Sequence, residues 1–188
     1  MKKALITGIN GQDGSYLSEY LLSLGYEVHG IIRRHSVAEN QNHRLVKYVT
    51  NGEVMTHYGD LLDYPSLVRV VSLVRPDERD LGAMSHVRVS FDMPSFTIQT
   101  NAMGVLNMLE VYRTLCPQAK FYQASSSEMF GNSVDEHGWQ RLDTLMSPVS
   151  PYGCSKVMGY NLVRHYRHAY GLHACNGILF NHESPRRG

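Results

Sequence analysis

The sequence has 188 residues, of which 43% are hydrophobic and 19% are charged, and its net charge at pH 7 is +1. This balance is typical of one globular domain with a sizeable core; it excludes global disorder and gives no reason to expect binding to nucleic acid or to a membrane surface. No apolar run approaches the roughly 18 residues of a membrane span, the N-terminus leads directly into a strand pattern instead of a signal peptide, and the three scattered cysteines indicate reduced thiols, so we expect a soluble cytoplasmic protein.

The first predicted elements are a strand, a glycine turn and a helix. Residues 3–7 predict a short buried strand, the pattern Gly8-x-x-Gly11-x-x-Gly14 follows at once, and residues 15–22 carry apolar side chains at helical spacing. Such glycines allow a tight bend, a close approach of the backbone to a pyrophosphate, and close packing of helix on strand. The N-terminus of the helix adds free N–H groups and partial positive charge. The turn therefore indicates a dinucleotide site, although a glycine-rich turn without a ligand would use the same residues.

The second predicted strand indicates which dinucleotide binds. Gly25 ends the first helix, residues 27–32 predict the strand, and Arg33 and Arg34 close it. In dinucleotide-binding folds an acidic residue at this place binds the ribose 2′-hydroxyl, whereas arginine accommodates a 2′-phosphate. The arginines favour NADP over NAD; the alternative is a solvated basic loop end.

The middle of the chain continues the alternation of strands and helices. We expect a polar loop around a short helix over 35–51, a strand over 53–58, and a helix from Pro65 to Val74. The charged residues 78–80 are a poor start for a buried parallel strand, because such strands are usually apolar throughout and a buried unpaired charge costs several kcal/mol. We therefore expect the next strand to be short and to lie at 81–84.

The last third predicts two more strands, each after a long helix. A helix follows Pro94, a strand covers 120–124, residues 130–149 have no clear period, a helix covers 151–170, and a strand covers 172–180. Strands that alternate with helices predict an α/β fold, a Rossmann-like doubly wound parallel sheet with helices on both faces.

Two pairs of side chains could carry acid–base chemistry. Tyr152 and Lys156 have the spacing Tyr-x-x-x-Lys, which puts both on one face of a helix. An adjacent ammonium stabilises a phenolate, whose tyrosine otherwise has a pKa near 10, so Tyr152 could act as a base toward a sugar hydroxyl. Ser126 and Glu128 offer a second set, in which the carboxylate could take a proton from carbon. The plain alternatives are a packing tyrosine beside a solvated lysine, and a glutamate that caps a helix.

These motifs resemble the extended short-chain dehydrogenase/reductase family, and within it the GDP-mannose 4,6-dehydratases. The resemblance covers nearly the whole chain and is most specific in its last residues. It is carried by 7–17, 29–34, 85–91, 121–131, 150–153 and 176–188.

The resemblance implies that residues 1–188 form an NADP-binding Rossmann-like domain of a lyase acting on GDP-mannose. Tyr152 would take the proton of the sugar 4-hydroxyl, and Glu128, supported by Ser126, would remove the C5 proton and assist loss of the C6 hydroxyl as water. Lys156 would hold the nicotinamide ribose and lower the pKa of Tyr152. Hydride passes to bound NADP and back, giving GDP-4-keto-6-deoxymannose. Family members usually form homodimers or tetramers.

The resemblance also implies a set of cofactor contacts at the glycine turn, at strand ends and near residue 188. They are Gly8, Ile9, Asn10, Gly11, Gln12, Asp13, Arg33, Arg34, His35, Ser36, Asp60, Leu61, Leu81, Gly82, Ala83, Met84, Ser85, Lys156, His182 and Arg187.

The sequence departs from the family pattern in three places. The family's C-terminal sugar-binding lobe is largely absent, residues 78–81 stand where relatives have a longer apolar strand, and Phe96 replaces a tyrosine that contacts the cofactor. Two other functions therefore stay open. One is a nucleotide-sugar epimerase or reductase of the same fold, for which Glu128 would be superfluous, and the other is a non-catalytic fragment that only binds NADP.

Overall fold

A six-stranded parallel sheet forms the centre of the computed structural model, which describes residues 1–34, 44–81 and 87–187, with the backbone alone for 78–81. The strand order is β3-β2-β1-β4-β5-β6, and every neighbouring pair is parallel. The strands are β1 (Lys3–Thr7), β2 (Glu27–Ile32), β3 (Val54–Tyr58), β4 (Glu78–Leu81), β5 (Lys120–Ser126) and β6 (Ala174–Leu179). The order reverses between β1 and β4, as in doubly wound dinucleotide-binding folds, so the predicted fold class is confirmed.

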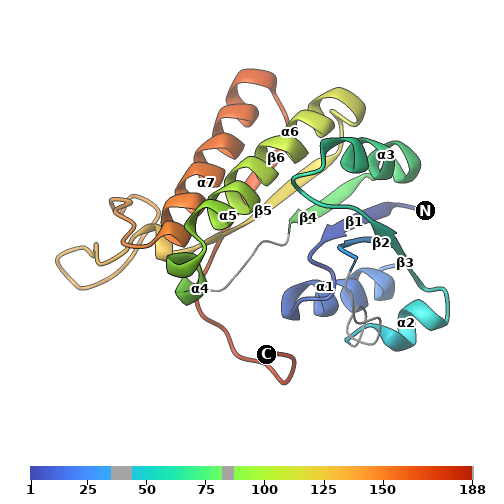
Figure 1. The fold of residues 1–188 in the computed structure, drawn as a ribbon, viewed down its shortest axis with the longest axis horizontal. Coiled ribbons are helices and arrows are strands. Elements are labelled where there is room, and N and C mark those ends of the chain that lie inside the picture. The colour runs from blue at the N-terminus through green and yellow to red at the C-terminus, as the bar shows by residue number, and fades with distance from the viewer. Residues whose placement is uncertain (35–43, 82–86, 188) are drawn as a thin grey trace.

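Helices lie on both faces of this sheet. Figure 1 shows α3, α6 and α7 along one face, and α1 and α2 on the other, beneath β1, β2 and β3. The helices are α1 (Gln12–Ser23), α2 (Val46–Thr50), α3 (Tyr64–Val74), α4 (Val87–Asp92), α5 (Pro94–Ile98), the π-helix η2 (Gln99–Met103), α6 (Gly104–Leu115), the 3-10 helix η3 (Ser127–Met129) and α7 (Pro151–Tyr170). Within the ranges that the structure covers, no helix combines the length and the apolar character needed to cross a bilayer.

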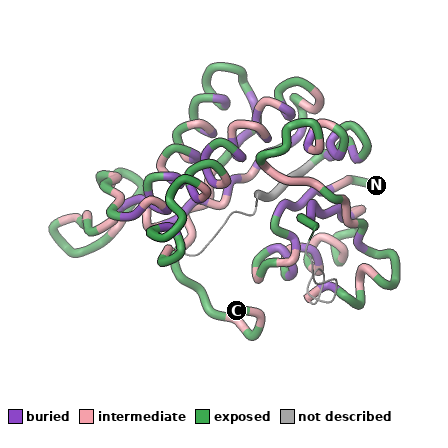
Figure 2. Tube along the Cα trace, in the orientation of Figure 1, coloured by how far each residue is buried: buried purple, intermediate pink, exposed green. Residues whose placement is uncertain are grey.

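Two hydrophobic cores hold the layers together. Leu5 of β1 packs with the inner sides of α3, α6 and α7, and the next residue, Ile6, packs with α1 on the opposite face. This follows from the period of two in a strand, which sends neighbouring side chains to opposite faces. Buried residues accordingly follow the strands and the inner helix faces in Figure 2, while most of the loop at 130–149 is exposed or half-buried. Both faces of β1 are thus buried, which positions the glycine turn at its end.

The prediction for the fourth strand was wrong in its position. The strand begins at Glu78, three residues before the expected start at Leu81, while residues 82–84 of the predicted range lie outside the described part of the chain. Backbone pairing explains the difference, because β4 lies between two strands: Glu78 pairs with Ala4 of β1 and with Lys120 of β5. Ladder hydrogen bonds on both sides hold the backbone extended whatever the side chains are.

The helix expected after Pro94 is divided. A short α5 passes through the π-helix η2 into α6, and α4 precedes them. The irregular stretch at 130–149 is confirmed, since it has neither helix nor strand. The other predicted elements occur within a few residues of their expected bounds.

Candidate active site

The glycine turn brings the start of α1 close to the end of β1. Gly8 has a φ of 68°, and the N–H of Gly11 donates to the carbonyl oxygen of Gly8 at 2.9 Å. A Cβ on Gly14 would lie 2.5 Å from that oxygen and 2.7 Å from the Cα of Ile9, so no side chain fits there. Gly11, which has no side chain to cap the helix, occupies the N-cap position. The first N–H groups of α1 are therefore available to a ligand at the exposed turn.

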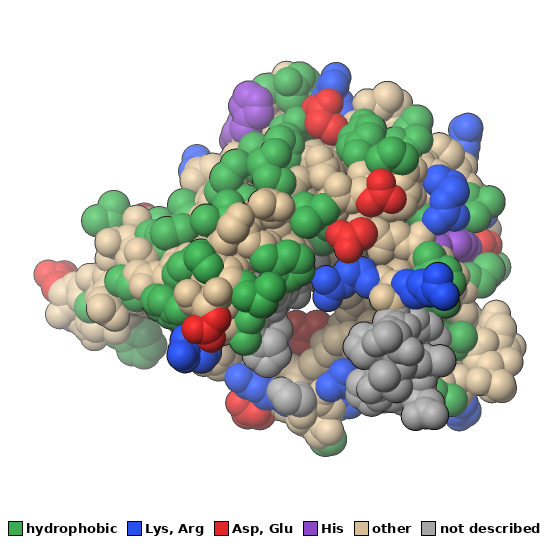
Figure 3. Space-filling model, in the orientation of Figure 1, with side chains coloured by type: hydrophobic (Ala, Val, Ile, Leu, Met, Phe, Trp, Pro, Cys, Tyr) green, Lys and Arg blue, Asp and Glu red, His purple; other side chains and the backbone are tan. Residues whose placement is uncertain are grey.

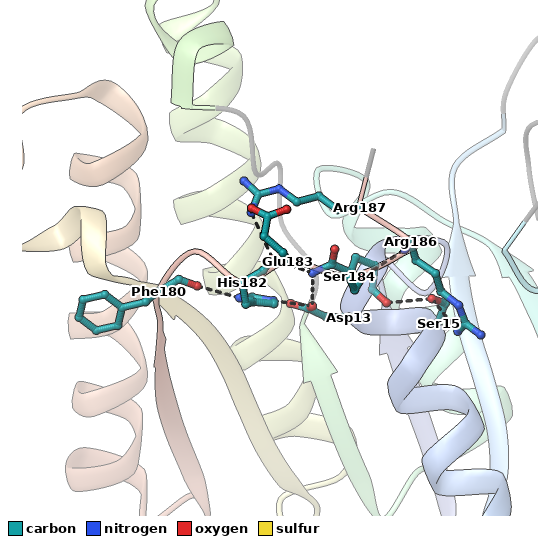
Figure 4. A network of polar contacts seen from close by, with 9 residues as sticks. Asp13, Ser15, Phe180, His182, Glu183, Ser184, Arg186 and Arg187 are labelled. Atoms are coloured by element: carbon teal, nitrogen blue, oxygen red, sulfur yellow. Dashed lines mark hydrogen bonds and ion pairs between the residues drawn. The ribbon is translucent and has the colours of Figure 1, made fainter.

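Residues 180–187, which we call the strap, cross from the end of β6 to the glycine turn. Nε2 of His182 lies 2.7 Å from Oδ1 of Asp13, and Nδ1 lies 2.7 Å from the carbonyl oxygen of Phe180. Gln12 donates from its amide to the carbonyl oxygen of His182 at 3.2 Å. Figure 4 shows His182 between Phe180 and Asp13. The hydrogen bond to Phe180, followed by that to Asp13, raises the pKa of His182 and favours its imidazolium form.

Arg187 lies on the same strap, close to the turn. Its guanidinium donates to the carbonyl oxygen of His182 at 3.1 Å and pairs with the carboxylate of Glu183, and its side chain is 43% exposed. Two predicted cofactor residues, His182 and Arg187, thus lie beside the glycine turn, from which they are about 170 residues distant in sequence.

A hollow lies beyond the ends of β2 and β3. The exposed Arg33 and Arg34 line it together with Asp60 and Arg69, and its volume is about 880 Å³. Figure 3 shows several Lys and Arg side chains near the middle of the face that it displays. Leu61, the residue after Asp60, contacts α6, since its carbonyl oxygen accepts from Asn107 at 2.8 Å.

The remaining predicted cofactor residues lie at the same carboxyl edge of the sheet or outside the residues that the structure describes. Leu81 is the last residue of β4. The predicted contacts outside the described residues are His35, Ser36, Gly82, Ala83, Met84 and Ser85.

The four predicted catalytic residues come together where β5 meets α7. Oγ of Ser126, at the end of β5, accepts from the backbone N–H of Glu128 at 3.2 Å and caps η3. A Cβ on Gly153 would lie 2.7 Å from the carbonyl oxygen of Glu128, so the first turn of α7 packs directly on η3. Tyr152, which is 7% exposed, therefore reaches Ser126, with which it shares a hydrogen bond, and lies near the Glu128 carboxylate.

The expected lowering of the tyrosine pKa is not produced by these residues. Burial raises the pKa of Tyr152 most, and the negative charge of Glu128 raises it further, while the hydrogen bond with Ser126 lowers it; the net direction is upward. Lys156 is 4% exposed, its Nζ donates to the carbonyl oxygen of Ala124 at 2.8 Å, and it lies 5.5 Å from the centre of the Tyr152 ring. The phenol is thus the favoured form of Tyr152 at neutral pH.

Sequence reasoning missed three residues that help to build this site. Arg44 and Arg186 connect the strap to the glycine turn and to α1. Asn101, buried in the π-helix, donates to the hydroxyl of Ser155 on α7 at 3.3 Å. No local pattern distinguishes these residues, because each acts through a partner that is distant in sequence.

Comparison with known proteins finds relatives of this chain by sequence and by fold. A family model described as GDP-mannose 4,6 dehydratase matches residues 5–188. A GDP-mannose 4,6-dehydratase from Vibrio cholerae is 51% identical over 193 residues, which cover 100% of this chain and 51% of that protein. A GDP-mannose 4,6 dehydratase from Drosophila melanogaster is 48% identical over 200 residues, which cover 100% of this chain and 49% of that protein.

A solved structure extends the likeness to three dimensions. It is that of DesIV, a dTDP-glucose 4,6-dehydratase from Streptomyces venezuelae with NAD and TYD bound, which is 26% identical with a TM-score of 0.81. The match covers 98% of this chain and 57% of that one. The chain spans about half the length of the curated relatives that it matches.

Proposed function

The chain belongs to the GDP-mannose 4,6-dehydratase family, and we propose that residues 1–188 form the NADP-binding domain of a lyase that removes water from GDP-mannose. The observation that carries the proposal is the meeting of Ser126, Glu128 and Tyr152 where β5 joins α7. This is the acid–base set that an elimination needs, and it lies at the same carboxyl edge of the sheet as the glycine turn.

The residues at the glycine turn fit a dinucleotide. The uncapped start of α1 suits a pyrophosphate, and Oε1 of Gln12 is buried with no hydrogen-bond partner among the described residues, so it is available to a ribose hydroxyl. Arg33 and Arg34 would hold a 2′-phosphate, while Lys156 would hold the nicotinamide ribose. When bound, NADP would supply the hydride acceptor and donor for an internal transfer.

The chain's own residues would move the protons. Tyr152 would take the proton of the sugar 4-hydroxyl, and Glu128 would take the C5 proton and deliver one to the departing C6 hydroxyl. Since burial keeps Tyr152 a phenol, its action as a base depends on a cationic neighbour, and Lys156 is 5.5 Å from its ring. Ser126 would hold Tyr152 and Glu128 close together, because it is hydrogen-bonded to the Tyr152 side chain and to the backbone N–H of Glu128.

The preference for NADP rests on the two arginines and is tested by binding. We expect the chain to bind NADP more tightly than NAD, and the double change Arg33→Ala with Arg34→Ala to remove most of the difference. A matched control is Arg88→Ala, which removes an exposed arginine from α4. Equal affinities for the two dinucleotides in the unaltered chain would overturn the choice of NADP.

The activity is tested by incubating the purified chain with NADP and GDP-mannose and following the nucleotide sugar by mass spectrometry for loss of one water. Appearance of the dehydrated product supports a dehydratase, and Glu128→Gln should then abolish it. An activity that survives Glu128→Gln indicates an epimerase or reductase instead. Intact GDP-mannose under conditions where NADP binding is measured would leave a cofactor-binding domain without catalysis.

We further propose that the chain acts as a homodimer or tetramer in the cytoplasm. Four large apolar side chains on or beside α4, α5 and η2 are exposed, which favours association with another protein surface. They are Phe91, Met93, Ile98 and Met103. The cysteines form no disulfide within the described ranges, in keeping with a reducing compartment. Light scattering of the purified chain measures the oligomeric state.

A further inference from the structure

Two consecutive arginines on the strap have different surroundings. Arg187 pairs only with residues of the strap itself among its described contacts, namely Glu183 and the carbonyl oxygen of His182, and it is the more exposed of the two. Arg186 is 26% exposed and reaches away from the strap to α1. Figure 4 shows the two side chains directed apart, with Arg186 toward Ser15.

The guanidinium of Arg186 makes three contacts with α1. Nη1 donates to the hydroxyl of Ser15 at 3.2 Å, Nη2 pairs with the carboxylate of Glu19, and the carbon at the centre of the group lies 4.1 Å from the centre of the Tyr16 ring. Glu19 is also hydrogen-bonded to Tyr48 of α2. A planar guanidinium that makes an ion pair, a hydrogen bond and a ring contact at once is held in one orientation.

A second arginine ties the same part of the strap to the glycine turn. Arg44 donates from Nε to the backbone carbonyl oxygen of Arg186 at 2.9 Å and from Nη1 to that of Asn10 at 3.0 Å. One guanidinium therefore bridges the backbone of the strap and the backbone of the turn, so that residues far apart in sequence are fixed relative to each other.

We propose that Arg186 is a positioning residue for cofactor binding: it docks the strap on α1 through Glu19 and Ser15, and thereby holds His182 and Arg187 beside the glycine turn. Arg186 acts at a distance from the ligand, because its guanidinium is directed to Ser15 and Glu19 of α1. The inference rests on the proposed function, since it takes the glycine turn as the dinucleotide site. Its consequence is that the contact of Arg186 with Ser15 and Glu19 sets the affinity for a ligand that Arg186 does not touch.

The test measures NADP affinity by calorimetry for Arg186→Gln and for the matched control Arg113→Gln, which breaks a comparable Arg–Glu pair on α6. If docking of the strap falls from nearly complete to about one tenth, the apparent Kd rises about tenfold. We expect such a rise for Arg186→Gln, no change for Arg113→Gln, and similar melting temperatures for both. The double change Arg186→Glu with Glu19→Arg should restore most of the affinity, which a general loss of stability would not allow.

Hydrogen exchange without cofactor provides an independent reading. The amides of residues 182–187 should exchange faster in Arg186→Gln than in the unaltered chain. If Arg186→Gln does not fold, Glu19→Gln and Arg186→Lys take its place in both measurements. Unchanged NADP affinity in a folded variant whose strap exchanges faster overturns the inference and leaves the proposed function standing. Absence of NADP binding by the unaltered chain instead overturns the proposed function, and with it the inference.

Discussion

The carboxylate of Asp13 and the imidazole of His182 lie 2.7 Å apart, although 169 positions separate them in the chain. The other ring nitrogen of His182 faces the carbonyl oxygen of Phe180, also at 2.7 Å. A ring whose two nitrogens both face acceptors is best satisfied when both carry a proton. The first turn of α1, where a phosphate is expected, thus has its own carboxylate neutralised by the strap.

This contact predicts a loss of stability as pH rises. Because folding raises the pKa of His182 above 6.5, its contribution is fully present below about pH 6.5 and disappears as pH rises through the folded-state value. His182→Gln removes this dependence, so the two proteins should differ more in free energy of unfolding at about pH 6 than at about pH 9. Urea unfolding at the two values measures the difference, with His168→Gln on the exposed side of α7 as control. An equal difference at both pH values would contradict the assignment of this pH dependence to His182.

The stacked pair His29 and His57 predicts the opposite pH dependence, a loss of stability as pH falls. Nδ1 of His29 lies 2.9 Å from Nε2 of His57, and its other nitrogen faces Glu27. Burial, followed by the charges of His29 and Arg69, lowers the pKa of His57 below 6.5. Its neutral form is favoured by folding, so this part of the stability is present above about pH 6.5 and is lost as pH falls through the folded-state value.

His57→Gln should therefore cost less stability at about pH 5 than at about pH 8. The same urea unfolding measurements check this, above the range in which Glu27 titrates, because that carboxyl has a pKa lowered from 4.5. A variant that loses more stability in acid than at pH 8 would mean that the folded chain favours the charged ring.

Gly14→Ala should destabilise the chain by about 1–3 kcal/mol through overpacking. The new methyl group would meet only backbone, at 2.5 Å from the oxygen of Gly8 and 2.7 Å from the Cα of Ile9, and backbone cannot turn aside as a side chain can. Gly52→Asn is the matched control, because that position has a φ of 73° and open space, and asparagine tolerates this conformation. Equal midpoints of urea unfolding for the two variants would show that the turn yields to the methyl group.

Tyr152→Phe should reduce dehydration of GDP-mannose about 10²–10⁴-fold, the usual worth of a positioned proton transfer, while NADP binding persists. Tyr160→Phe, two turns further along α7 and partly exposed, is the control and should leave the rate unchanged. Product formation followed by mass spectrometry, together with calorimetric binding of NADP, separates chemistry from affinity. A Tyr152→Phe chain with an unaltered rate would remove Tyr152 from the catalytic set.

The sequence predicted most of the fold, because the signals were local. Strand β1, the turn and α1 are encoded by adjacent apolar runs and glycines, and Tyr152 with Lys156 by their spacing on one helix. Strand β4 begins earlier than predicted because its extension comes from pairing with β1 and β5, which no property of residues 78–81 reveals.

The errors at the site have a similar origin. The pKa of Tyr152 depends on how deeply the fold buries the ring, and burial together with the charge of Glu128 outweighs the hydrogen bond with Ser126. Lys156 directs its ammonium to the carbonyl oxygen of Ala124. The sequence also could not show that Arg186 and Arg187 have different roles. Arg186 docks on α1 because it contacts Ser15 and Glu19, which are far from it in sequence.

The sheet is covered unevenly by helices. This implies that β1–β3 and β5–β6 open locally at different rates. Helices α1 and α2 lie beneath β1–β3, whereas Figure 1 shows no helix from the described residues beneath β5 and β6, where Cys175 is exposed. Amide protons of β6 should therefore exchange by local opening well before those of β1, whose two faces are buried. Because α7 packs on β5 and β6, Tyr152 belongs to the half that loosens first.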